Sequence, residues 1–114
     1  PNDPDLHFKI ALYFFIVDDL NETLKHLNKS IRLQPEEGKT HYFAGLIHHL
    51  MGNGVGAVNH MKRAEESFVK KKQVKSIADV RKHLRVYQNQ YGIPGIQGEG
   101  SSIAEAAHQQ KKYN

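Results

Sequence analysis

The feature that most constrains the fold is an internal repeat: similar residues recur at one fixed spacing, which is the spacing from position 11 to position 45. We call this spacing the repeat offset. Five pairs of positions match in size or chemistry at this offset: Ala11 with Gly45, Asp18 with Gly52, Thr23 with Ala57, Leu27 with Met61, and Ser30 with Ala64. A fixed period of this length is typical of folds that stack one supersecondary unit on the next. We therefore expect two related units along the chain.

The spacing of apolar residues indicates that these units are helical. Apolar residues recur at intervals of three and four positions, which places them on one face of a helix. We expect helices over residues 4–17 and 20–33, from residue 35 to a stop at Gly52, from an Asn53 cap through Phe68, and over residues 76–91. The predicted fold class is therefore all-α.

Polar residues at the predicted helix starts support these boundaries. Asp19 with Glu22, and Ser76 with Asp79, have the spacing of a capping box. Glu36 and Glu37 follow Pro35, so we expect them in the first turn of the third helix, where negative charge suits the helix dipole.

The small residues fit a close packing of helix pairs. Ala11 and Gly45 lie midway along the first helix of each unit, and Ser30 and Ala64 leave room for the next unit to pack. Pro35 closes the first unit. The repeat offset equals the period of the tetratricopeptide repeat, about 34 residues. Residues 4–69 accordingly resemble two tetratricopeptide repeats, and the helix over 76–91 resembles the capping helix of such arrays.

The resemblance implies antiparallel helix hairpins in a right-handed superhelical array, with about two repeats and a capping helix. It also implies a scaffold for protein–protein interaction. A generic antiparallel helical bundle is the alternative. We expect a helical domain over residues 1–91, a Gly-rich linker over 92–101, and a tail over 102–114 in which Ser102 and Glu105 can cap a short helix.

In the tetratricopeptide family the first helix of each unit lines a concave surface. The resemblance places these candidate partner-binding residues there: Phe8, Leu12, Phe15, Ile16, Tyr42, Leu46 and His49. Such an apolar and aromatic surface suits a partner's helix or extended peptide. Alternatively, the first helix packs against another repeat or a second subunit, and the chain is then a structural or assembly subunit of a homo-oligomer or larger complex.

The second half of the chain is basic, within a formal net charge of +4. The candidate basic patch consists of Lys70, Lys71, Lys72, Lys75, Arg81, Lys82 and Arg85. It could serve an adaptor for an anionic surface, either RNA or lipid. However, Glu65, Glu66 and Asp79 interrupt it and no aromatic residues are interleaved, so we expect a solvated face that steers partners, and no nucleic-acid partner.

Other chemistry has little support in the sequence. Eight histidines are present, but a zinc site needs three or four converging ligands, and we expect surface and half-buried histidines that titrate near their usual pKa. No phosphate-binding loop or catalytic triad stands out, so we expect no enzyme activity and no cofactor. The longest apolar run, residues 10–17, falls short of the roughly 20 residues that span a membrane. The compartment is not specified; cytoplasm or the interior of an organelle fits best.

Overall fold

The computed structural model describes residues 2–95, and within this range the chain is all-helical with no strand. The all-α prediction is therefore confirmed. The five helices are α1 (Pro4–Ile16), α2 (Leu20–Leu33), α3 (Gly38–Leu50), α4 (Gly54–Lys70) and α5 (Val74–Tyr91). The predicted linker beyond residue 95 and the predicted short helix over 102–114 lie outside the described residues.

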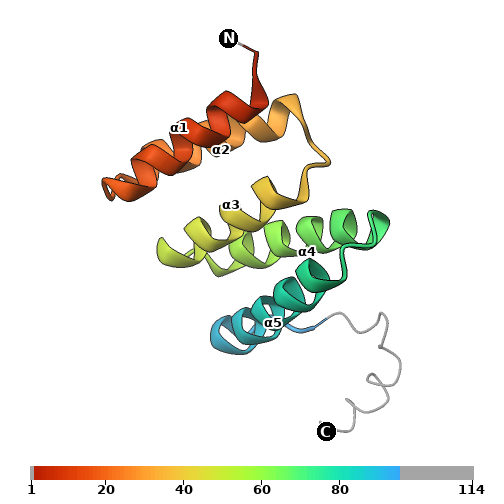
Figure 1. Cartoon of the computed structure of the whole chain (residues 1–114). Helices are drawn as coiled ribbons and strands as arrows, with labels where there is room; N and C mark the ends of the chain where they lie inside the picture. The colour runs from red at the N-terminus through yellow and green to blue at the C-terminus, as the bar shows by residue number, and fades with distance from the viewer. Residues whose placement is uncertain (1, 96–114) are drawn as a thin grey trace, which may run out of the picture.

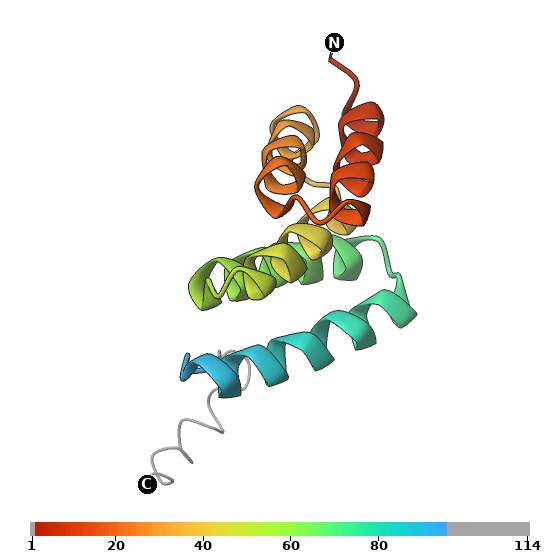
Figure 2. The ribbon, with the colours of Figure 1, turned by 90° about the vertical axis from the view of Figure 1, so that its left-hand side faces the viewer.

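The helices stack in chain order along the long axis of the molecule. Each helix packs against the next one in the sequence, from α1 against α2 to α4 against α5. Figure 1 shows the α1–α2 pair above the α3–α4 pair, with α5 at the end opposite the N-terminus; the view of Figure 2 shows the same order. The extents of 51 × 29 × 21 Å describe an elongated stack, in which most contacts join neighbours in the sequence.

The repeat offset is reproduced in the helix boundaries. α3 begins and ends one repeat offset after α1, and α4 begins one repeat offset after α2. The turns match as well, because Asp18 and Gly52 both have positive φ, at 64° and 78°. The next residue caps the following helix in each case: the side-chain oxygens of Asp19 and Asn53 each accept a backbone N–H bond of 3.1 Å. The two units are therefore alike in their helix starts, their turns and their caps.

Two apolar clusters hold the stack together. One joins the first three helices through Ala11, Leu27, Phe43, Ala44 and Ile47. The other joins α4 to α5 through Ala57, Val58, Met61, Ala64, Phe68, Val80, Leu84 and Tyr87. Leu46 packs against both clusters, so the two are continuous. Burial of each large apolar side chain contributes roughly 1.5–3 kcal/mol.

The small residue at position 45 is explained by this packing. A Cβ atom added to Gly45 would lie 3.0 Å from Met61 Cε and 3.2 Å from the carbonyl oxygen of Ala57. The absence of a side chain therefore lets α3 and α4 approach closely, as the sequence predicts for this position.

Two predicted helix starts are wrong. The third helix begins at Gly38 and not at Pro35, so Glu37 is its N-cap and Glu36 lies outside its first turn. The chain turns there through a backbone bond from Glu37 N–H to Gln34 O of 3.2 Å. The fifth helix begins at Val74, ahead of Ser76, so the predicted capping box does not form.

The early start of α5 has a backbone cause. Lys72 adopts a positive φ of 57°, as Asp18 and Gly52 do in the earlier turns. The Gln73 N–H donates to Phe68 O at 2.9 Å, which matches the Asp19 and Asn53 bonds of 2.8 Å to the preceding helices. In all three turns the residue with positive φ is followed by one further residue, and then the next helix begins. This geometry, and not the side-chain cap, sets the start of α5.

A substitution at Gly54 distinguishes close packing from helix propensity as the factor that sets the stability of the first turn of α4. The residue is buried, and the ring of Tyr91 from α5 occupies the space that a Cβ would need. Propensity alone predicts that Gly54→Ala stabilises the chain. We expect instead a loss of about 1–3 kcal/mol in the free energy of unfolding, because the larger residue overpacks this contact.

Urea denaturation of the Gly54→Ala, Tyr91→Ala and double variants measures this loss. In the Tyr91→Ala background the cost of Gly54→Ala disappears, because the opposing ring is gone. An equal cost in both backgrounds would show that the Tyr91 ring is not the cause.

Candidate functional site

α1 exposes more large apolar side chains than any other described helix. They are Leu6, Leu12, Tyr13, Phe15 and Ile16, with Val17 directly after the helix. Leu50 and Met51 at the end of α3 are also exposed. Apolar side chains gathered over two neighbouring helix ends are typical of interaction surfaces, whereas scattered ones are common on any protein.

The predicted partner-binding residues of α1 divide into two groups. Leu12 and Ile16 are exposed, Ile16 to 79%. Phe8 and Phe15 point toward α3, where their rings lie edge-on to Phe43 with centroids 5.8 and 5.5 Å apart. Phe15 nevertheless stays 40% exposed. The open part of this surface is therefore formed by Leu12, Phe15 and Ile16.

The predicted partner-binding residues of α3 are half-buried, and α5 covers two of them. The Tyr42 ring lies edge-on to His83 with centroids 5.2 Å apart, and the His49 ring stacks on Tyr87 at 4.4 Å. The Tyr91 hydroxyl also lies 2.9 Å from His49 Nδ1. Leu46 packs against both apolar clusters. Leu50, at the end of α3, is exposed, whereas α5 partly covers Tyr42 and His49.

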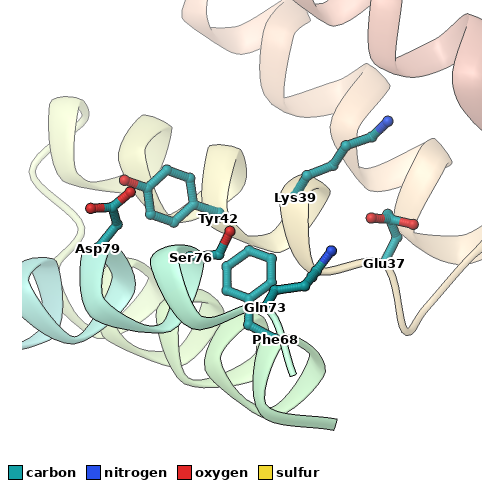
Figure 3. Close-up of a pocket in the computed structure, with 7 residues that line it drawn as sticks. All are labelled: Glu37, Lys39, Tyr42, Phe68, Gln73, Ser76 and Asp79. Carbon is teal, nitrogen blue, oxygen red and sulfur yellow. The ribbon is translucent and has the colours of Figure 1, made fainter. Parts of the chain in front are cut away.

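A pocket of about 280 Å³ lies where the first turns of α3 and α5 meet the end of α4 (Figure 3). Its lining consists of Glu37, Lys39, Tyr42, Phe68, Gln73, Ser76 and Asp79. Lys39 lines this pocket and also contacts α1: its Nζ lies 4.9 Å from the centroid of the Phe8 ring and 4.0 Å from Asp5 Oδ1. An aromatic floor with a charged rim suits a side chain that has an apolar stem and a polar end.

The predicted basic patch is partly neutralised. Lys70 and Lys71 lie 3.8 and 3.9 Å from carboxylate oxygens of Glu36 and Glu37, and Arg81 pairs with Glu65. The other four residues, Lys72, Lys75, Lys82 and Arg85, are exposed at the start and along the outer face of α5. Exposed ion pairs of this kind contribute less than about 1 kcal/mol each and weaken further with salt.

The histidines form an arrangement that the sequence interpretation missed. In the α3–α4 pair the His60 ring stacks between His41 and His48, with centroids 5.3 and 5.1 Å away. In the α1–α2 pair the His26 ring lies in the same way between His7 and Phe14, at 5.5 and 5.7 Å. Each residue of the α1–α2 group precedes its counterpart in the α3–α4 group by one repeat offset. The repeat offset was therefore the signal that could have found these stacks.

Hydrogen bonds fix the proton positions of the buried stack. A carbonyl oxygen can only accept, so His41 Nε2–H donates to Pro35 O at 2.8 Å. In the neutral ring His41 Nδ1 is then the acceptor, and His60 Nδ1–H donates to it at 3.0 Å. The amide of Asn53 donates to His48 Nδ1 at 3.0 Å. All three rings thus serve as neutral groups, and a second proton on His41 would break its bond to His60.

Burial lowers the pKa of His41 and of His48 below the usual value of 6.5. Burial, with the nearby His41, His48 and Arg63 as smaller causes, lowers the pKa of His60 to about 4. The expectation that the histidines titrate near their usual pKa is therefore wrong for this stack. Across residues 2–95, no three His, Asp or Glu side chains are placed to hold a metal ion.

The chain matches no protein-family model, no curated protein and no solved structure. None of the helices within residues 2–95 combines the length and the apolar character needed to cross a membrane.

The histidine stack predicts a loss of stability in mild acid. The unfolded chain binds protons on these histidines at about pH 6.5, whereas the folded chain resists protonation of His60 down to about pH 4. Their contribution is therefore complete above about pH 6.5 and falls as the pH falls from there to about 4. For His60 alone the loss by pH 4 is on the order of 3 kcal/mol, since one pKa unit corresponds to about 1.4 kcal/mol.

Urea unfolding at several pH values between 7 and 4 measures this loss. His60→Gln reduces the slope of stability against pH in that range, while Asn59→Gln, an exposed neighbour on α4, leaves it unchanged. A slope that stays the same in His60→Gln would show that other groups cause the acid sensitivity.

Proposed function

We propose that the chain is a protein-binding scaffold of the tetratricopeptide type. A helix or extended peptide of a partner lies on the exposed apolar surface that Leu12, Phe15 and Ile16 of α1 form with Leu50 of α3. The observation that carries this proposal is the exposure of these four large apolar residues on neighbouring helices. We call them the α1–α3 surface.

The repeat-like construction supports the fold that this proposal requires. The helix boundaries, turn geometry and histidine stacks recur at the repeat offset, which is the length of one tetratricopeptide repeat. In the proposed fold the two helix pairs are antiparallel hairpins, α5 is the capping helix, and successive hairpins follow a right-handed superhelix.

The physical argument for partner binding is the free energy of the exposed apolar groups. Complete burial of a Leu, Ile or Phe side chain contributes roughly 1.5–3 kcal/mol. Complete burial of four such side chains contributes at most about 6–12 kcal/mol, and association itself costs about 4–15 kcal/mol, so these residues anchor a partner whose other contacts complete the affinity. The neighbouring pocket beneath Lys39 adds a place for one amphipathic side chain of the same partner.

Negative charge placed on the α1–α3 surface should prevent a partner from binding there. We expect Leu12→Glu with Leu50→Glu to abolish co-purification of the partner from a native extract, because the carboxylates cannot be buried unpaired. Both side chains are at least 40% exposed, so the free energy of unfolding changes by less than about 0.5 kcal/mol. Affinity capture, with urea denaturation of the same variants, measures both quantities.

The control is Lys82→Glu on the exposed basic face of α5, which keeps the partner. Loss of the partner in this variant, together with a steep decrease of binding between low and moderate salt, would instead favour the adaptor for an anionic surface. Concentration-dependent self-association of the wild-type chain that Leu12→Glu abolishes would favour a homo-oligomer. Retention of every captured protein by the double variant contradicts the proposed surface.

A further inference from the structure

A second apolar face of α1 is separate from the α1–α3 surface. Leu6, Ile10, Tyr13 and Val17 follow one another at helical intervals of four, three and four, which places them in one stripe along the helix. Successive residues of a helix point about 100° apart, so Tyr13 faces a different direction from Leu12. Leu6, Tyr13 and Val17 are exposed, Tyr13 to 59%, and Ile10 is half-buried. We call these residues the Tyr13 stripe.

The internal repeat identifies the kind of element that covers such a stripe. The residues one repeat offset later, on and just after α3, are Thr40, Ala44, Ile47 and Met51. The first three of them are buried, with at most 1% exposure. Met51, the last of the four, is exposed. Ala44 and Ile47 lie in the apolar cluster that α2 shares with α3.

α2 makes this contact with a stripe of matching spacing. Leu20, Leu24, Leu27 and Ile31 follow one another at the same intervals of four, three and four, and all four belong to or pack against the same cluster as Ala44 and Ile47. In this chain, therefore, an amphipathic helix with leucine and isoleucine at α2's spacing covers the face of α3 that corresponds to the Tyr13 stripe.

We propose that the Tyr13 stripe is the docking face for an amphipathic helix of another protein, with leucine or isoleucine residues at the spacing of α2. This inference rests on the proposed function as a helical scaffold, but it names a different face and the partner's apolar pattern. The partner's helix packs on α1 as α2 packs on α3, and so extends the stack beyond α1.

A second copy of this chain does not supply that helix in its folded form. The apolar stripe of α2 is already in use, since Leu27 is fully buried between α1 and α3. Another copy could offer α2 only by giving up its own core. The partner helix is therefore not the α2 of a second folded copy.

Differences between α1 and α3 define the partner further. Leu6 and Ile10 replace the smaller Thr40 and Ala44, so the partner helix lies farther from α1 than α2 lies from α3 and covers more apolar surface. The exposed Lys9 stands where α3 has the buried Phe43.

The test uses the whole chain and a fluorescent peptide of residues 19–34, made helical by a hydrocarbon link between positions 21 and 25, which are exposed on α2. Fluorescence anisotropy measures binding to wild type, Tyr13→Glu and Leu12→Glu. We expect saturable binding that Tyr13→Glu weakens by about tenfold or more and Leu12→Glu leaves within about twofold. A peptide with Leu24→Glu and Leu27→Glu does not bind.

The proposal is overturned by no saturable binding to wild type, by equal binding to Tyr13→Glu, or by equal weakening in Leu12→Glu. Self-association of the chain that Tyr13→Glu abolishes also overturns it, because the occupant is then a second copy. If circular dichroism shows that Tyr13→Glu is unfolded, Val17→Glu, which lies just after the helix on the same stripe, replaces it. Whether Leu12→Glu with Leu50→Glu loses a captured partner tests the α1–α3 surface, and its result is independent of this peptide experiment.

Discussion

A tight turn of one recurring geometry determines where α2, α4 and α5 begin. These three turns each contain one residue with positive φ, at Asp18, Gly52 and Lys72, and the next residue donates a backbone bond to the preceding helix. For a residue other than glycine this conformation costs on the order of 1 kcal/mol or more. Asp18 and Lys72 adopt it nevertheless, because the packing of both helices beside the turn outweighs the cost. The turns thereby fix which residues of each helix face the core.

Much of this fold could be predicted from the sequence, because it depends on local periodicity. The spacing of Leu27, Met61 and Val80 within their helices places them in the core, and all three are fully buried. The wrong start at residue 35 came from the proline and the acidic residues after it, and the wrong start at Ser76 came from a capping-box pattern; in both places the backbone turn decided. Lys72 has no sequence signature for a positive φ, so the start of α5 at Val74 was not predictable from a capping rule.

The candidate surface was only partly predictable, since exposure depends on contacts between distant residues. The apolar character of α1 indicated an interaction surface, but not its division into two faces. Sequence reasoning identified the helix over 76–91 as a capping helix but did not place Tyr87 and Tyr91 against His49, which they cover. The histidine stacks were missed for a related reason: His41 and His60 lie on different helices and meet only when those helices pair.

The linear stacking of the helices has a consequence for how the molecule opens. Because contacts join mainly neighbours in the sequence, separate parts of the stack can unfold without the rest, and the ends open before the middle. α1 is covered on fewer sides than α3, which α2, α4 and α5 all contact. The backbone amides of α1 therefore exchange with solvent hydrogen sooner than those of α3. A partner on either exposed face of α1 slows that exchange, and so converts a loosely held end into an ordered one.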